Sequence, residues 1–186
     1  MDLNGKKVLI LATNGFEQSE LEVPRDKLKE AGATVHVVSP ENGEIRGWDM
    51  KDWGHSVKVD KTLADVSADD YDAIVMPGGQ INPDLLRVNA DALALIRAFY
   101  DSGKVVAAVC HAPWLLIETG IIKGRKATSY KSIKTDLVNA GARWEDKEVV
   151  VDQRLITSRN PGDLAAFSAK IIEEINEGRH QRRSAA

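Results

Sequence analysis

The chain has 186 residues, of which 43% are hydrophobic, and its 25 Lys and Arg against 28 Asp and Glu give a formal net charge of −3. This length suits one domain with a substantial core, and the charge balance shows no nucleic-acid surface. No apolar run approaches the roughly 18 residues that a membrane helix needs. We expect a single domain over residues 1–178 and a solvated basic tail over residues 179–186.

The first apolar run, VLILA, is shorter than the roughly 7 to 15 residues of a signal-peptide core, so it is interpreted as a buried strand. The single cysteine of the chain has no partner for an internal disulfide. Both features favour a reducing, cytoplasmic location.

Short β-branched runs then alternate with helical patterns. Runs that are apolar on both faces, as in a parallel sheet covered by helices, predict strands at residues 7–13, 34–39, 73–79 and 105–110. Glycines, aromatic residues and alternation predict a hairpin or another β-excursion at residues 44–60, and a second hairpin is predicted at residues 148–158. The alternation predicts an α/β fold with a mostly parallel central sheet between two helical layers.

Two helices are predicted beside these strands. One ends over residues 28–33 with Gly32 near its C-terminus, and Pro24 either starts its regular part or kinks it. An amphipathic helix over residues 164–175 closes the fold.

Ligands of such sheets bind beyond the carboxyl ends of the strands. Cys110 ends one predicted strand, and the helix predicted over residues 111–120 has Pro113 in its first turn and Gly120 past its end. Cys110 therefore lies on a sharp strand-to-helix turn, the geometry of a nucleophile elbow. The helix N-terminus is expected to lower the thiol pKa below about 7 and to favour the thiolate. The alternative is a packed cysteine without chemistry.

Residues at two other strand ends favour the nucleophile. Gly78 and Gly79 can present backbone N–H groups as an oxyanion site. Glu17 follows the first strand and is the candidate carboxyl partner of the thiol.

His111 directly follows Cys110, but consecutive side chains on a tight turn usually point apart, so His111 would need an orienting acid of its own. Asp84 is the candidate. The alternative is that Asp84 is only a first-turn acid of a helix with Asn82 as N-cap and Pro83 at its first position.

Together these motifs resemble the ThiJ/PfpI superfamily, within it the branch of PfpI-like intracellular proteases and general stress proteins, which has a class I glutamine amidotransferase-like fold. The resemblance spans residues 15–164 and rests on GFEQSEL, DAIVMPGGQINPDLLR, VVAAVCHAPWLL, GIIKGRKATSY, DLVNAGARWEDKEVVVD and LITSRNPGDL. It implies a flavodoxin-like three-layer sandwich.

The resemblance also implies roles for single residues. Cys110 would be the nucleophile, and Glu17 a largely protonated carboxyl hydrogen-bonded to its sulfur. His111 would pair with Asp84 of a neighbouring subunit, which puts the active site at the interface of a homo-oligomer. The backbone amides of Gly79 and His111 would form the oxyanion site. Tyr130 would lie near the pocket.

This chain departs from the family pattern at four positions. Ala112 replaces a common Gly, Trp114 a common Gln and Asn160 a common His, and Asp84 is shorter than the Glu of some members. Trp114 either lines the pocket or packs.

Three functions follow, none with an expected cofactor or metal. The first is a cysteine-dependent enzyme for reactive carbonyls, a glutathione-independent glyoxalase or a protein deglycase acting on small carbonyls or glycated proteins through the Cys110 thiolate. The second is an intracellular cysteine peptidase with an intersubunit triad of Cys110, His111 and Asp84. The third is a redox-sensing chaperone. An amidotransferase is disfavoured because His180 lies in the tail.

Overall fold

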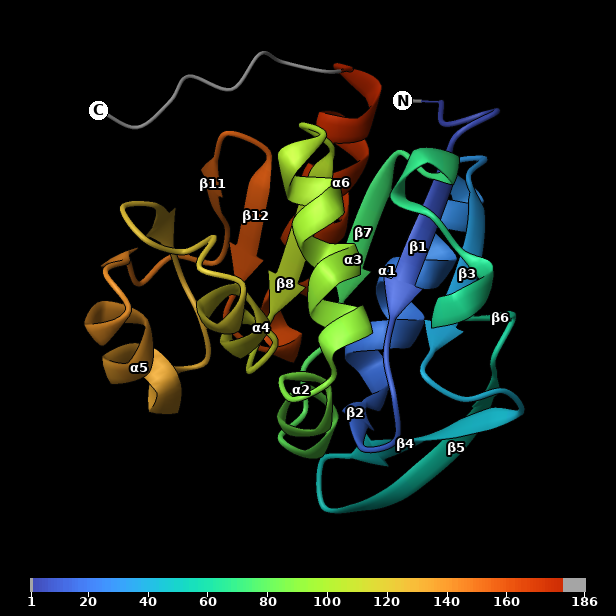
Figure 1. Ribbon diagram of the computed structural model, residues 1–186, viewed down its shortest axis with the longest axis horizontal. Coiled ribbons are helices and arrows are strands. Elements are labelled where there is room, and N and C mark those ends of the chain that lie inside the picture. Colours follow the sequence, from blue (N-terminus) through green and yellow to red (C-terminus); the bar gives the residue numbers. More distant parts are fainter. Residues whose placement is uncertain (1, 179–186) are drawn as a thin grey trace.

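A computed structural model describes residues 2–178, and the predicted tail lies outside these residues. Its centre is a seven-stranded sheet in the order β11-β12-β8-β7-β1-β3-β6 (Figure 1). Every neighbouring pair in the sheet is parallel except β11 and β12. The strands are β1 (Lys7–Leu11), β3 (Thr34–Ser39), β6 (Lys61–Thr62), β7 (Ala73–Met76), β8 (Val105–Val109), β11 (Val150–Asp152) and β12 (Leu155–Ser158). The predicted mostly parallel sheet is confirmed.

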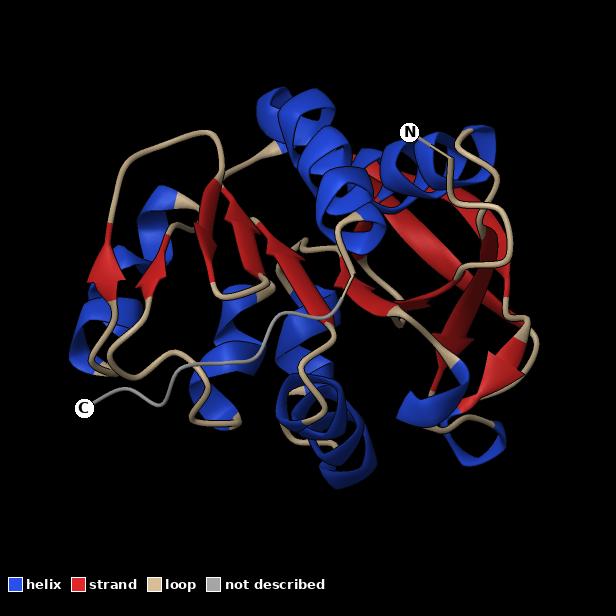
Figure 2. Cartoon of the chain, turned by 90° about the horizontal axis from the view of Figure 1, so that it is seen from above, coloured by secondary structure: helices blue, strands red, loops and turns tan. Residues whose placement is uncertain are grey.

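Helices cover both faces of this sheet (Figure 2). One layer contains α1 (Gln18–Glu30) and α6 (Leu164–Asn176), and the other contains α2 (Ile81–Leu86), α3 (Ala90–Asp101) and α4 (Pro113–Glu118). Alternate residues of β1 enter the two cores, because Ile10 belongs to the cluster that contains Phe167 of α6, whereas Leu9 belongs to the cluster that contains Phe99 of α3. A strand buried on both sides is apolar throughout, which explains the continuous apolar runs of the sequence.

The helix expected near Gly32 begins earlier than Pro24, at Gln18. Pro24 lies inside α1 and has no N–H for the carbonyl of Glu20. The buried side chains of this helix include Glu20, Pro24 and Leu28, which are spaced four residues apart and form one stripe.

Both predicted hairpins are present. The first consists of β4 (Glu44–Asp49) and β5 (Asp52–Lys58), and β4 pairs in parallel with the short β2 (Phe16–Glu17) that precedes α1. This pairing holds the hairpin over the carboxyl end of β1 (Figure 1). The second is the antiparallel pair of β11 and β12.

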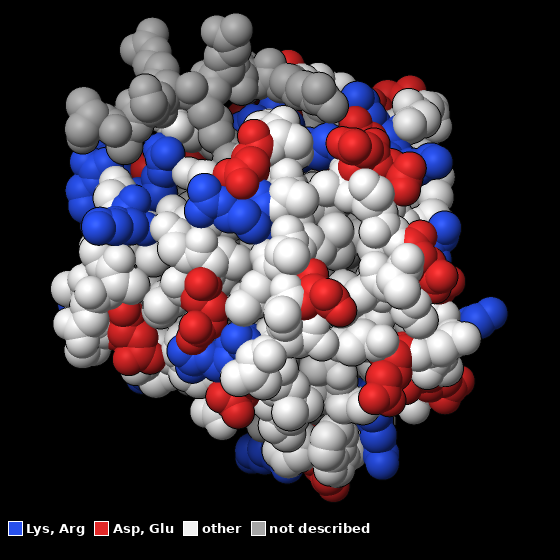
Figure 3. Space-filling model, viewed as in Figure 1, with Lys and Arg blue, Asp and Glu red and all other residues white. Residues whose placement is uncertain are grey.

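Three further short elements lie at the β11 end of the sheet (Figure 1). They are α5 (Lys134–Asn139) and the parallel pair of β9 (Lys126–Ala127) and β10 (Arg143–Trp144). Among residues 2–178, no helix is long and apolar enough to cross a membrane. Acidic and basic side chains are interspersed over the face in Figure 3, which carries no continuous field of one sign.

Candidate active site

The turn between β8 and α4 has the geometry of a nucleophile elbow. Cys110 has a φ of 64°, a left-handed conformation that costs free energy for a residue with a side chain. Neighbouring backbone holds it there, because the Cys110 N–H donates to the Ser158 carbonyl at 3.0 Å and its carbonyl accepts from the Tyr130 N–H at 2.8 Å. The side chain is 6% exposed.

The carboxyl group beside the sulfur belongs to Glu20, so the expected contact with Glu17 is wrong. Glu20 is fully buried, its Oε2 accepts from the Gly78 N–H at 2.8 Å, and its side chain interacts with Cys110. Glu17 is the extended N-cap residue of α1 and lines the same cavity farther from the sulfur. The helix begins one residue after Glu17, and its buried stripe carries Glu20 into the site. No local sequence signal separates Glu20 from Glu17, because the choice depends on the residue at which the helix begins.

Burial dominates the titration of this pair. It raises the pKa of Glu20 to about 8, against the hydrogen bond from Gly78 that lowers it. Burial also raises the pKa of the Cys110 thiol, as does the negative charge of an ionised Glu20. The expected lowering of the thiol pKa is therefore wrong, because desolvation outweighs the N–H groups of Gly79 and His111 that favour the thiolate.

The His111 ring contacts the thiol directly, so the expectation that the two side chains point apart is also wrong. His111 Nδ1 lies 3.2 Å from Cys110 Sγ, and Nε2 lies 3.1 Å from Ser132 Oγ. Burial lowers the His111 pKa, so the ring is neutral at neutral pH. A neutral ring that accepts the S–H proton at Nδ1 carries its own hydrogen at Nε2 and donates it to Ser132. Ser132 lies in a short 3-10 helix, Lys131–Ile133, and has no sequence signature.

Asp84 does not complete this arrangement within one chain. It is exposed on α2, and the described residues show no hydrogen bond between it and His111. Asn82 is not the N-cap, since Gln80 occupies that position. The buried Asn82 amide instead accepts from the Thr13 N–H at 2.7 Å and donates to the Gly78 carbonyl at 3.1 Å. It thereby ties the end of β1 to the glycine pair.

The two glycines have different tasks. The Gly78 N–H is occupied by Glu20, so its predicted place in an oxyanion site is wrong. The N–H groups of Gly79 and His111 interact with the sulfur of Cys110. Gly79 has a φ of 77°, and a Cβ there would lie 2.7 Å from the Glu17 nitrogen, so only glycine brings this amide to the sulfur.

These groups open into a cavity of about 620 Å³. Its lining comprises Gly15, Glu17, Glu20, Trp48, Met50, Gly79, Gln80, Ile81, Cys110, His111, Tyr130 and Pro161. Tyr130 stacks on His111 with ring centroids 4.9 Å apart. Trp114 is absent from the lining. It packs edge-on against His111 at 5.2 Å and donates from Nε1 to Asp136 at 2.9 Å.

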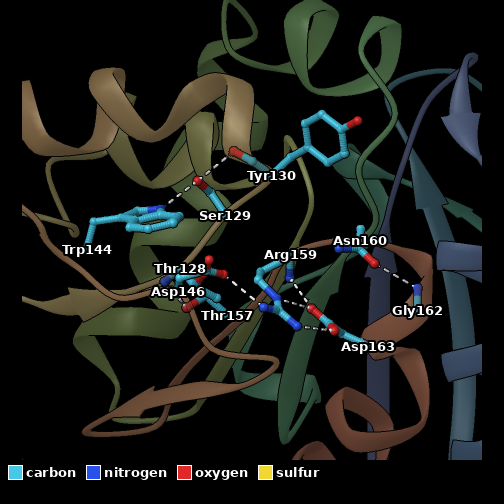
Figure 4. A network of polar contacts seen from close by, with 10 residues as sticks. All are labelled: Thr128, Ser129, Tyr130, Trp144, Asp146, Thr157, Arg159, Asn160, Gly162 and Asp163. Carbon is cyan, nitrogen blue, oxygen red and sulfur yellow. Dashed lines mark hydrogen bonds and ion pairs between the residues drawn. The ribbon is translucent and has the colours of Figure 1, made fainter.

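A polar network supports the Tyr130 side of the cavity (Figure 4). Ser129 Oγ accepts from Trp144 Nε1 and donates to the Tyr130 carbonyl, both at 3.0 Å. On the facing loop, Arg159 binds the buried Asp163 with two parallel hydrogen bonds of 2.9 and 3.0 Å. Asn160, the departure from the family His, accepts from the Gly162 N–H at 2.9 Å and caps the turn. These bonds hold the two segments that contribute Tyr130 and Pro161 to the cavity lining.

The described residues contain no group of three or more His, Cys, Asp or Glu side chains arranged to hold a metal ion. The site is instead a cysteine at a strand-to-helix elbow, with a buried carboxyl on one side and an imidazole on the other. The protein is thus an α/β sandwich with a cysteine-centred pocket at the carboxyl edge of its sheet.

Comparison with known proteins identifies the family. Residues 6–174 match the DJ-1/PfpI family, and the chain belongs to it. Deglycase PfpI of Pyrococcus furiosus is 45% identical over 167 residues, covering 90% of this chain and 98% of that protein. General stress protein 18 of Bacillus subtilis is 43% identical over 170 residues, covering 90% and 96%. The crystal structure of Drosophila melanogaster DJ-1beta, 32% identical, covers 95% of each chain with a TM-score of 0.83.

Proposed function

We propose that this protein is a cytoplasmic stress-response enzyme that converts reactive carbonyls, as a glutathione-independent glyoxalase or a protein deglycase. The observation that carries the proposal is the position of Cys110 Sγ, 3.2 Å from His111 Nδ1 and beside the Glu20 carboxyl, in a cavity of about 620 Å³. The deglycase PfpI and general stress protein 18 are similar to this chain over nearly their whole length, which supports both parts of the proposal.

The proposed reaction begins with a proton transfer. Because burial keeps the Cys110 thiol protonated and the His111 ring neutral, His111 Nδ1 takes the S–H proton as the sulfur adds to the aldehyde carbon of methylglyoxal. The C–S bond forms and the aldehyde π bond breaks. The resulting oxyanion accepts hydrogen bonds from the Gly79 and His111 N–H groups and is then protonated to a hemithioacetal.

A second proton transfer completes the internal redox change. His111 removes the hydrogen of the former aldehyde carbon as a proton and returns it to the neighbouring carbon, while the proton of the hemithioacetal hydroxyl moves to the ketone oxygen. The aldehyde carbon is thereby oxidised and the ketone carbon reduced. The product is a lactoyl thioester of Cys110. Water then cleaves the C–S bond and releases lactate and the free thiol. A protonated Glu20 hydrogen-bonds the leaving sulfur, in accord with its raised pKa.

The homo-oligomer with Asp84 at a subunit interface remains part of the proposal. Around Asp84, the exposed side chains of Ile81 and Leu85 on α2 and of Val88 in the turn after α2 are 40%, 50% and 83% accessible and give this region an apolar face. Docking of this face on a second copy would bring Asp84 of one chain toward another chain. Ser132 already partners His111 Nε2, so Asp84 would join that hydrogen bond or replace it.

The test measures lactate from methylglyoxal, and free amine from methylglyoxal-treated N-acetyllysine, with the wild type and with Cys110→Ala. We expect both products to require Cys110. Casein cleavage that requires Cys110, without either carbonyl activity, would replace the proposal by the peptidase. Stoichiometric Cys110 oxidation by dilute peroxide without any turnover would replace it by the redox sensor.

A further inference from the structure

The cavity around Cys110 is lined by acidic side chains and by no basic ones. Its lining includes the carboxyl groups of Glu17 and Glu20 but no Lys or Arg. Glu20 is committed to the Gly78 N–H and to Cys110, and His111 is neutral. Glu17 is therefore the one charged group of the lining that the proposed chemistry does not use.

The surroundings of Glu17 suit a bound cation. Burial raises the Glu17 pKa, the Met50 N–H opposes this with a hydrogen bond, and the negative charge of Asp49 adds to it. Within this cavity lining no basic side chain neutralises the Glu17 carboxyl. A positively charged ligand would replace the lost solvation.

The rest of the wall suits the stem of a long side chain. Trp48 and Tyr130 present aromatic rings, and Met50 and Ile81 present apolar surface, in the same cavity. Aromatic faces attract Lys ammonium and Arg guanidinium groups, and apolar walls accept their methylene chains.

We propose that Glu17 makes the active site select carbonyl adducts carried on Lys and Arg side chains over adducts on neutral or anionic groups. The inference rests on the proposed function, since it names the substrate class of the same site. A hydroxyalkylated guanidinium keeps its positive charge, and a hydroxyalkylated amine carries one when it is protonated, so Glu17 attracts both cations. The released hydroxy acid is an anion and meets no cationic side chain in the lining, which favours its departure.

The first experiment needs no catalytic turnover. Cys110 is modified with two methanethiosulfonates of similar size, one with a trimethylammonioethyl group and one with a sulfonatoethyl group. In each case a disulfide forms with Cys110 and methanesulfinate leaves. The rate of modification by the cationic reagent is divided by the rate for the anionic reagent. This ratio is then divided by the same ratio for free N-acetylcysteine amide, which removes the intrinsic difference between the reagents. The normalised ratio reports the electrostatic potential at the Cys110 sulfur.

We expect a normalised ratio above one for the wild type, falling about fivefold to tenfold in Glu17→Gln. High salt should reduce the wild-type ratio, because Glu17 is only partly buried. Glu22→Gln removes a carboxylate from the same helix outside the cavity lining and should keep the ratio. Glu17→Asp keeps the charge and should retain part of the preference. Equal ratios in the wild type and in Glu17→Gln would overturn the inference.

The second experiment compares turnover of methylglyoxal adducts of N-acetylarginine and N-acetylcysteine. We expect the ratio of their kcat/KM values to fall about fivefold to tenfold in Glu17→Gln, through KM for the arginine adduct. An equal loss on both adducts would overturn the inference, because Glu17 would then serve the chemistry. A wild type inactive on both adducts refutes the proposed function, whereas the reagent ratios still decide whether Glu17 selects cations.

Discussion

The Sγ of Cys110 lies 3.2 Å from Nδ1 of His111, its neighbour in the chain, although adjacent side chains on a tight turn ordinarily diverge. The left-handed φ of 64° at Cys110 changes the direction of the chain between the two residues. Tyr130 and Trp114 then hold the imidazole from two sides, with ring centroids at 4.9 and 5.2 Å. The elbow thus builds a thiol–imidazole pair from two consecutive residues.

Replacing the His111 imidazole should slow the reaction of the Cys110 thiol with alkylating reagents. We expect His111→Gln to reduce carboxamidomethylation of Cys110 at pH 7 by at least about tenfold, because a buried thiol then lacks its proton acceptor. Mass spectrometry of the alkylated protein gives the rate. Ser132→Ala is the matched control that only frees Nε2, and it should slow the reaction by about twofold to fivefold. A His111→Gln rate equal to that of the wild type would show that His111 is not the base.

The buried carboxyl should make stability depend on pH. Folded Glu20 holds its proton up to about pH 8, whereas the unfolded chain releases it near the ordinary value of 4.5. The folded state therefore binds more protons within this window. The contribution of protonated Glu20 to the free energy of unfolding is fully present below pH 4.5 and is lost as the pH rises through about 8.

Urea unfolding at pH 5, 6, 7 and 8 measures this loss, which is about 1.4 kcal/mol per pH unit for one proton. In Glu20→Gln the free energy of unfolding should change less over the same range, because the amide does not titrate. Parallel curves for the wild type and the variant would mean that Glu20 is ionised in the folded protein.

The amide of Gly79 can be tested against a glycine of equal conformation. Gly79 and Gly124 have φ values of 77° and 76°, but a Cβ meets nothing within 4 Å at Gly124 and lies 2.7 Å from the Glu17 nitrogen at Gly79. Each alanine variant carries the same backbone strain, about 1 kcal/mol.

We therefore expect Gly79→Ala to lower the free energy of unfolding by about 1–3 kcal/mol more than Gly124→Ala, as overpacking typically does. Only Gly79→Ala should also slow Cys110 alkylation. Equal destabilisation by the two variants would show that the backbone around Gly79 shifts to accommodate a Cβ without a loss of stability.

The proposed interface makes a separate prediction. Leu85 is 50% exposed next to Asp84 on α2, and Leu85→Arg places a charge in the apolar face. We expect Leu85→Arg to dissociate an oligomer that light scattering detects for the wild type, and Asp84→Asn to lower turnover about tenfold without dissociation. Val138→Arg is the control at another exposed apolar residue, 47% accessible, on α5. A wild type that is monomeric at micromolar concentration would remove Asp84 from the site.

The sequence by itself determined the sheet, its two helical layers and the elbow at Cys110. These features depend on local patterns: apolar runs of strand length, and Pro113 and Gly120 at the two ends of a helix. Each of these patterns predicts its own strand or helix without information about distant residues.

Only the tertiary structure decided which groups meet the sulfur. Glu17 and Glu20 lie three residues apart in one motif, and the first helical residue and the buried stripe of α1 select Glu20. The direction of the thiol pKa was likewise decided by burial, a property of the packed core. The contact of Ser132 with His111 joins residues 21 positions apart, and Ser132 reaches the ring from a short 3-10 helix. The roles of Glu20 and Glu17 follow from where packing excludes water, and no local pattern contains that information.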